Sequence, residues 1–133
     1  MIKLKFKYIA NYYYNMLSGL DTNGYLELIT GCMFSGKTSK LIELYKQYDL
    51  CDIPVAVINH AGDDRYSTTH LATHDGQQIP CTITTNLEDI SSSDSIQNAK
   101  VILINEGQFF SDIVPWVTAC VEDEGKIVFV CGL

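Results

Sequence analysis

Short apolar runs recur along the chain, and they predict the strands of a buried β-sheet. The runs are Tyr25–Thr30, 55–59, Val101–Ile104 and 127–131. Most are continuous and rich in Val and Ile, as is typical of strands that are covered on both faces. A further short strand is predicted at 79–84. The polar segment between the second run and this strand, 60–78, is predicted to be a long surface loop.

Between the first two runs lies a segment whose apolar residues recur at helical spacing. Leu41, Leu44, Tyr45 and Tyr48 fall on one face and predict a helix that ends near Leu50.

A second long helix is predicted after residue 112. Asp112 is its candidate N-cap, Pro115 is tolerated in the first turn where no N–H is needed, and Gly125 suits its end. The side chains predicted to turn inward are Ile113, Val117, Cys120 and Val121. Asn86 could cap a short helix through Leu87 and Ile90, and 91–94 reads as a polar turn or the start of another helix.

The segment 1–23 differs from the rest of the chain. Apolar residues alternate with lysines at its start, and a tyrosine-rich patch follows. A signal peptide needs an unbroken apolar stretch after the basic residues, and none is present here. We therefore expect a partly ordered extension at 1–23 and one domain at 24–133, without an internal repeat or linker.

The strongest chemical signal is a phosphate-binding motif, G-x-x-x-x-G-K-[ST], between the first strand and the first helix. It comprises Gly31, Cys32, Met33, Phe34, Ser35, Gly36, Lys37 and Thr38. Its glycines let backbone N–H groups converge on phosphate oxygens, Lys37 can reach the terminal phosphates, and the Thr38 hydroxyl can ligate Mg²⁺. A chance match on a glycine-containing turn is the alternative, but the flanking strand and helix favour a true phosphate loop.

Together these patterns predict an α/β fold, a P-loop nucleotide-binding domain with a mostly parallel sheet flanked by helices. Ligands of such sheets bind at the carboxyl ends of the strands. Glu106 follows the strand Val101–Ile104 and would lie at that edge. It could accept a proton or orient water during phosphoryl transfer, or it could be an ordinary solvated glutamate.

The segment that begins Asp63-Asp64-Arg65 offers a second candidate. Arg65 could form surface ion pairs with the flanking acids, or it could stabilise charge on a transferring phosphate. Spacing alone favours the surface pair. Phe109 and Phe110 are most simply core residues, although one could stack on a base.

Composition narrows the function classes. The chain has 133 residues, 47 % of them hydrophobic, which suits one domain with a single core. Its formal net charge of −7 argues against a nucleic-acid or membrane surface, because the field would repel polyanions. ATP is not excluded, since backbone amides hold its phosphates locally. The five cysteines contain no C-x-x-C pair, so we expect neither a disulfide scaffold nor a zinc site within the chain, and a reducing, cytoplasmic location.

These motifs, in this order, resemble those of the type II thymidine kinases of animals, bacteria and large DNA viruses. Residues 32–38 are similar to the family's P-M-F-S-G-K-[ST], 63–67 to D-x-R-Y-S, 73–75 to T-H-D, and 105–113 to D-E-[GA]-Q-F-F-x-D-[IL]. The resemblance covers roughly 24–133.

The family transfers a phosphoryl group from ATP, with Mg²⁺, to the 5′-hydroxyl of thymidine. By resemblance, Glu106 is the general base. The resemblance places Asp63, Asp64, Arg65, Asn105, Gly107 and Gln108 in the nucleotide site beside the phosphate loop. Met33 and Phe109 would line the thymine pocket. The family also implies a homo-oligomer, typically a tetramer, for the intact protein.

Two departures from the family pattern matter. Asn105 replaces the acid before the general base, and its neutral amide is expected to weaken Mg²⁺ binding. The sequence also stops where the family continues into a substrate loop, a lasso and zinc-binding cysteines, so we expect a fragment or a truncated reading frame. Cys32 in place of proline is a lesser change. Rival interpretations are a nucleotide-binding protein without kinase activity and an ATPase in which Glu106 polarises water.

Overall fold

A six-stranded sheet forms the centre of the molecule. This computed structural model describes residues 2–5, 24–32, 35–62, 70–73 and 75–132. The strand order is β1-β2-β8-β7-β3-β6. The strands are β1 (Ile2–Lys5), β2 (Tyr25–Thr30), β3 (Val55–His60), β6 (Thr82–Thr84), β7 (Val101–Ile104) and β8 (Ile127–Gly132). The four strands predicted from the principal apolar runs are confirmed.

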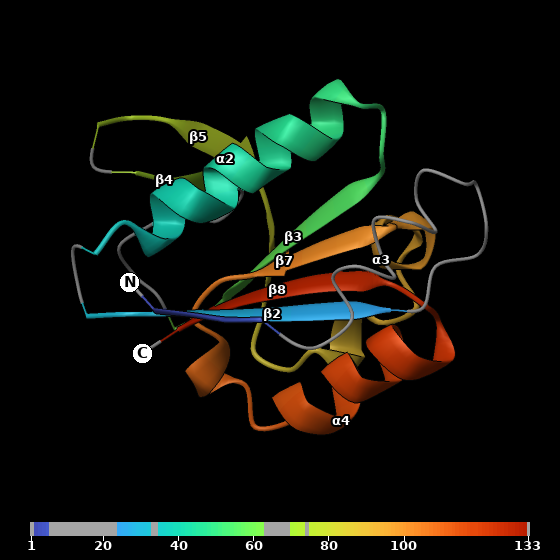
Figure 1. Cartoon of the computed structure of the whole chain (residues 1–133). Coiled ribbons are helices and arrows are strands. Elements are labelled where there is room, and N and C mark those ends of the chain that lie inside the picture. Colours follow the sequence, from blue (N-terminus) through green and yellow to red (C-terminus); the bar gives the residue numbers. More distant parts are fainter. Residues whose placement is uncertain (1, 6–23, 33–34, 63–69, 74, 133) are drawn as a thin grey trace.

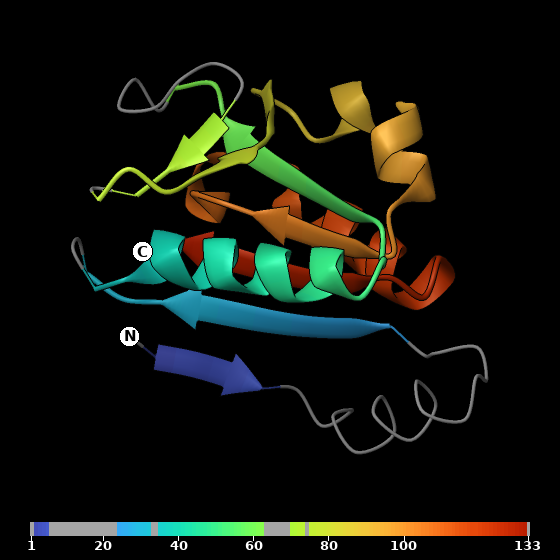
Figure 2. The same ribbon diagram turned by 90° about the horizontal axis from the view of Figure 1, so that it is seen from above.

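Five neighbouring strands of this sheet run parallel, in the order β2, β8, β7, β3 and β6. This arrangement confirms the predicted fold class. β8 lies between β2 and β7, with Leu26 opposite Val128 and Val128 opposite Ile102. β1 comes from the amino-terminal segment and pairs antiparallel with β2, Ile2 opposite Thr30. Figure 2 shows the arrowheads of β2 and β7 pointing toward the start of α2, whereas that of β1 points the other way.

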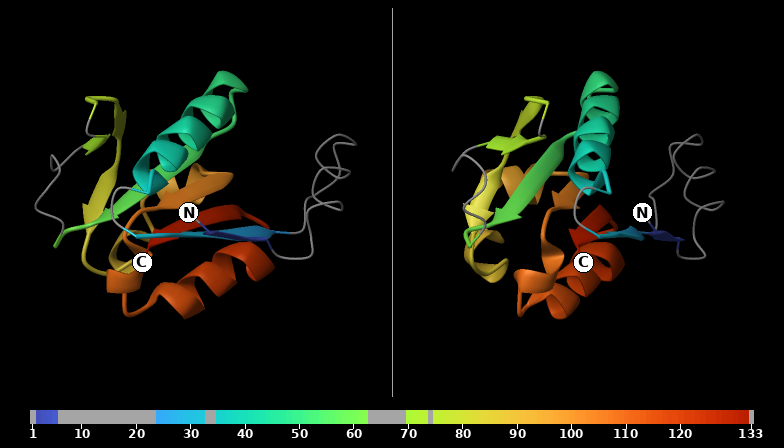
Figure 3. Two further views of the ribbon diagram at one scale, coloured as in Figure 1. Left: turned by 60° about the vertical axis from the view of Figure 1, so that its left-hand side comes forward. Right: turned by 90° about the vertical axis from the view of Figure 1, so that its left-hand side faces the viewer.

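Helices cover both faces of the sheet. Helix α2 (Lys37–Leu50) lies on one face, and α3 (Asp94–Asn98) and α4 (Ile113–Thr118) belong to the other (Figure 1). Side chains alternate between the two cores because strand residues alternate in direction. Leu103 of β7 packs on the α2 side, and Ile102 packs with Trp116 on the α4 side. The views in Figure 3 show α2 and α4 on opposite sides of the sheet.

The predicted loop at 60–78 and strand at 79–84 are both wrong in part. A hairpin of β4 (His70–Ala72) and β5 (Gln78–Pro80) forms a separate two-stranded sheet, and β6 joins the main sheet instead. Each hairpin strand carries one buried apolar side chain, Leu71 or Ile79, which packs in the α2-side core. One apolar position in a polar stretch gives no periodic signal, so the tertiary contact decides the structure.

The predicted cap at Asn86 is also wrong. The short 3-10 helix η1 (Glu88–Ile90) has Leu87 at its N-cap position. Its backbone donors are satisfied from elsewhere in the chain, because the Asp112 carboxylate accepts hydrogen bonds from the N–H groups of Leu87 (3.3 Å) and Glu88 (3.0 Å). Asp112 does occupy the N-cap position of α4, but its side chain makes no cap bond there.

The helix predicted after residue 112 is present, but it is α-helical only over α4 (Ile113–Thr118). α4 passes at Ala119 into a π-helical segment, η3 (Ala119–Asp123), and Gly125 follows with φ 64°. Pro115 lies in the first turn of α4, as predicted. Among the helices that the structure describes, none has the length and apolar character that a bilayer crossing needs.

Candidate functional site

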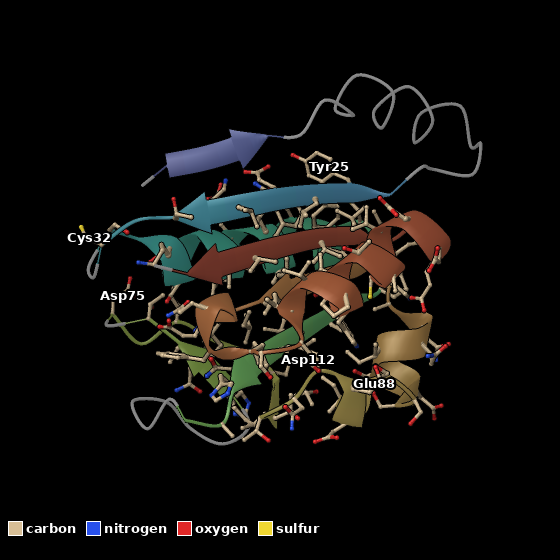
Figure 4. The ribbon with its side chains drawn as sticks, turned by 90° about the horizontal axis from the view of Figure 1, so that it is seen from below. Tyr25, Cys32, Asp75, Glu88 and Asp112 are labelled. Carbon is tan, nitrogen blue, oxygen red and sulfur yellow. The ribbon has the colours of Figure 1, made fainter. Side chains whose placement is uncertain are left out.

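Parallel topology brings the motifs singled out in the sequence to one edge of the sheet. β2 leads into the phosphate-loop motif, β7 leads into Asn105 and Glu106, and β3 ends at His60. Because β8 alone separates β2 from β7, the two motifs lie roughly 10 Å apart across the sheet. Figure 4 labels Tyr25 near one end of β2 and Cys32 beyond the other, and Asp75 lies at the same edge as Cys32.

The segment after β2 turns tightly into α2. Gly36 precedes the helix with φ 86° and ψ 17°, a left-handed conformation that glycine adopts without steric penalty. The N–H of Ser35 donates to the Cys32 carbonyl at 3.3 Å, and that of Lys40 donates to the Gly36 carbonyl at 3.0 Å. The predicted strand–loop–helix context of the motif is therefore confirmed. Met33 and Phe34 lie outside the described residues.

The Lys37 ammonium lies over this loop. Its Nζ donates to the carbonyl oxygens of Gly31 at 2.5 Å and Cys32 at 2.8 Å. The Ser35 hydroxyl is buried and has no hydrogen-bond partner among the residues that the structure describes. A buried hydroxyl without a partner is costly, so this atom fits a site completed by an acceptor such as a phosphate oxygen. Thr38 follows in the first turn of α2 and is half-buried.

Glu106 has an unusual backbone conformation. Its φ of 55° and ψ of 45° place it in the left-handed region, which non-glycine residues rarely occupy. The next residue is a tightly enclosed glycine, since a Cβ on Gly107 would lie 2.4 Å from Cγ1 of Val130. Strained backbone of this kind is concentrated at functional sites.

The Glu106 carboxylate is oriented by a neighbouring amide. Nε2 of Gln108 donates to Oε2 of Glu106 at 2.6 Å. The Gln108 side chain in turn lies against the end of β8, where a Cβ on Gly132 would come within 2.5 Å of its Oε1. A glycine at this position therefore leaves the space that the amide occupies. Gln108 thus lies between the two motifs, above β8.

The pKa of the Cys131 thiol is affected by charged groups from both motifs. Burial raises its pKa to about 12, Lys37 lowers that pKa, and Glu106 and Glu27 raise it. The thiol also contacts the Lys37 carbonyl oxygen at 3.6 Å. In the strand order, β8 lies between β2, whose loop leads to Lys37, and β7, which leads to Glu106. The structure therefore brings a loop cation and a carboxylate together across β8.

A buried amide pair joins β3 and β7 at the same edge. Nδ2 of Asn105 donates to Oδ1 of Asn59 at 3.1 Å, and both side chains are buried. Within the described part of the chain, Nδ2 of Asn59 has no hydrogen-bond partner. Sequence reasoning treated Asn59 only as the end of a strand. The sequence did contain a signal that Asn59 lies near the site. It is a polar residue directly after the apolar residues 55–58, at the end of the strand where ligands bind.

The two phenylalanines after Glu106 differ. Phe110 is buried, but Phe109 is 55 % exposed, so the prediction that both are core residues is wrong for Phe109. The His60 ring contacts both, with ring centroids 4.8 Å from Phe110 and 5.6 Å from Phe109. Backbone direction explains the difference, because Phe110 follows the short 3-10 helix η2 (Gly107–Phe109) and faces the core.

Other predicted site residues lie outside the description or apart from the loop. Asp63, Asp64 and Arg65 belong to the undescribed residues, as does His74. A turn forms around Asp75 and Gly76: the N–H of Gly76 donates to the Thr73 carbonyl, and the Thr73 hydroxyl donates to the Asp75 carboxylate. The hydroxyl of Thr73 lowers the pKa of Asp75.

Comparison with known proteins follows the same motifs. The family profile described as "TK: Thymidine kinase" matches residues 24–133. The thymidine kinase of Yaba monkey tumor virus is 40 % identical over 111 residues, which cover 84 % of this chain and 59 % of that protein. The thymidine kinases of sheeppox virus and of vaccinia virus are 38 % and 40 % identical over 110 residues, or 60 % of each. The chain spans about three fifths of the length of these curated relatives. It belongs to the thymidine kinase family.

Proposed function

We propose that this chain forms the ATP-binding and phosphoryl-transfer part of a thymidine kinase, which transfers the γ-phosphoryl group of ATP to the 5′-hydroxyl of thymidine. The observation that carries the proposal is the strand order, in which β8 lies between β2, whose loop leads to Lys37, and β7, which leads to Glu106. Family membership supplies the nucleoside.

The donor phosphates would occupy the loop between Gly31 and Thr38. There the Lys37 ammonium would leave the loop carbonyls for phosphate oxygens, and the Ser35 hydroxyl would gain the acceptor that it lacks. Charged donors in fixed positions stabilise the charge that develops on the transferring group. Arg65, with Asp63 and Asp64, would complete the donor side.

Mg²⁺ would neutralise phosphate charge, and two neutral oxygens of this chain suit it. They are the Thr38 hydroxyl and the side-chain oxygen of Asn105, which is left over because Nδ2 of Asn105 is bonded to Asn59. Hard oxygen ligands and ordered water are what Mg²⁺ prefers, and it usually binds with only one or two protein groups plus phosphates.

Glu106 would act on the acceptor. As the 5′-oxygen forms its bond to the γ-phosphorus, the bond from that phosphorus to the β–γ bridging oxygen breaks and ADP leaves. The hydroxyl proton passes to the Glu106 carboxylate. The Gln108 amide donates to one carboxylate oxygen and so orients the carboxylate that would accept the proton. Phe109, exposed beside Glu106, would face the nucleoside base.

The decisive experiment compares the chain with its Glu106→Gln variant in a radiolabelled thymidine assay and in an ATP-binding titration. General-base catalysis contributes about 10²–10⁴-fold, so thymidine monophosphate formation should fall by at least about 100-fold while ATP affinity stays nearly unchanged. Full activity of the variant would refute the general-base role.

A second candidate is a nucleotide-binding protein without kinase activity, and the neutral Asn105 favours it. ATP binding by the wild-type chain without thymidine monophosphate formation would select this candidate. Phosphate release that does not depend on thymidine would instead indicate an ATPase. As a kinase of this family, the intact protein is proposed to be cytoplasmic and to assemble as a homo-oligomer.

A further inference from the structure

Asn59 lies behind the reaction centre and is fully buried at the end of β3. Its Oδ1 accepts the hydrogen bond from Nδ2 of Asn105, 46 residues later in the chain. The backbone supports the same contact, because the N–H of Asn105 donates to the Ile58 carbonyl at 2.9 Å. A side-chain bond and a backbone bond thus fix Asn105 to β3.

This tie joins two segments that the reaction needs together. β3 ends at His60, and β7 leads through Asn105 directly into Glu106. Glu106 has a left-handed backbone, which persists only where its surroundings hold it. A fixed Asn105 supplies that constraint on its amino-terminal side.

We propose that Asn59 is a positioning residue for the metal-nucleotide site: it holds the Asn105 amide so that the Asn105 oxygen, and not the nitrogen, is the group left for hydrated Mg²⁺. The inference rests on the proposed function. A side-chain amide has one acceptor and one donor end, and the bond to Asn59 occupies the donor end.

The unsatisfied donor of Asn59 supports the same role. Asn59 offers Asn105 an acceptor although its own Nδ2 donor is buried without a partner. Leaving a buried donor unsatisfied is unfavourable, so packing alone would favour an apolar side chain at this position. Orientation of Asn105 explains why an amide is present.

The test uses Asn59→Leu, which keeps the branched arrangement of heavy atoms, is larger, and has no acceptor. Calorimetric titrations of a non-hydrolysable ATP analogue are made at a series of MgCl₂ concentrations. Loss of a group that orients a metal ligand typically weakens metal affinity about 10–100-fold, so the half-saturating Mg²⁺ concentration should rise at least about 10-fold. Affinity for the analogue without Mg²⁺ should stay within about twofold of wild type, as for a change away from the phosphates.

Asn98→Leu is the matched control, because Asn98 is an exposed asparagine at the end of α3, near the opposite edge of the sheet. It should leave the Mg²⁺ requirement unchanged. A merely structural role for Asn59 would lower the urea midpoint of the variant without moving its Mg²⁺ requirement, and that result would overturn the inference.

A measurement on the wild-type chain covers the case in which Asn59→Leu does not fold. With asparagine-selective ¹⁵N labelling, the side-chain amide signal of Asn105 should shift when Mg²⁺ is added to the bound ATP analogue, and that of Asn98 should not. An unmoved Asn105 signal would overturn the inference while analogue binding still supported the proposed function. No analogue binding at any Mg²⁺ concentration would reject the proposed function itself.

Discussion

The left-handed backbone of Glu106 makes a prediction with an unusual sign. In the middle of a helix or strand, a glycine variant is less stable than an alanine variant by about 0.5–1 kcal/mol, because glycine loses more conformational freedom on folding. At φ 55° a Cβ instead costs about 1–2 kcal/mol. Both Glu106→Gly and Glu106→Ala remove the bond to Gln108, so their difference isolates the backbone. We expect the glycine variant to be more stable than the alanine variant by about 0.5–1 kcal/mol.

The assay is urea unfolding followed by fluorescence of Trp116, a buried reporter. With a denaturant slope of about 1–2 kcal/mol/M, the midpoints should differ by about 0.5 M. Asp52, with φ 58°, should give the same order of glycine and alanine. Exposed Glu122, in the helical segment η3, should give the ordinary order. An alanine variant at 106 as stable as the glycine variant would refute backbone strain at this residue.

Two further predictions follow from buried polar groups. The Lys126 ammonium donates to the carbonyls of Ile96, Gln97 and Ala99 at 3.1, 3.1 and 2.6 Å. Lys126→Met removes this donor from buried acceptors, so it should lower the free energy of unfolding by about 2 kcal/mol or more. Urea unfolding measures this free energy. As a control, Lys100→Met changes an exposed lysine and should alter the free energy of unfolding by less than about 0.5 kcal/mol. Equal losses in the two variants would contradict the role of Lys126. Asn105→Asp should lower the Mg²⁺ concentration needed for ATP binding, because it adds charge and the unpartnered Nδ2 of Asn59 can turn to donate to the new carboxylate. An unchanged Mg²⁺ titration would reject that reasoning.

Local pattern was sufficient for the four principal strands of the sheet and for the phosphate loop. Continuous apolar runs such as Val101–Ile104 are buried on both faces, and the spacing of the glycines around Lys37 predicts the turn that the structure contains. Both signals are encoded within a few consecutive residues. The parallel arrangement then follows from the alternation of strands and helices.

Features that depend on distant partners were not predictable in this way. Leu71 and Ile79 become buried only because α2 covers them, and the amide pair of Asn59 and Asn105 joins residues on different strands. The adjacent Phe109 and Phe110 have the same chemistry, yet one is exposed and one buried. Backbone direction after Glu106 decides this, and no side-chain pattern reports it.

The most direct test of the central claim is equilibrium binding of ATP to the wild-type chain and to Lys37→Ala, measured by calorimetry at fixed Mg²⁺. If main-chain amides and Lys37 hold the triphosphate between β2 and β7, wild type binds and the variant loses at least about 10-fold in affinity, the equivalent of 1.4 kcal/mol for one charge-assisted contact. Equal affinity of the two proteins, or no binding by wild type, would contradict the account.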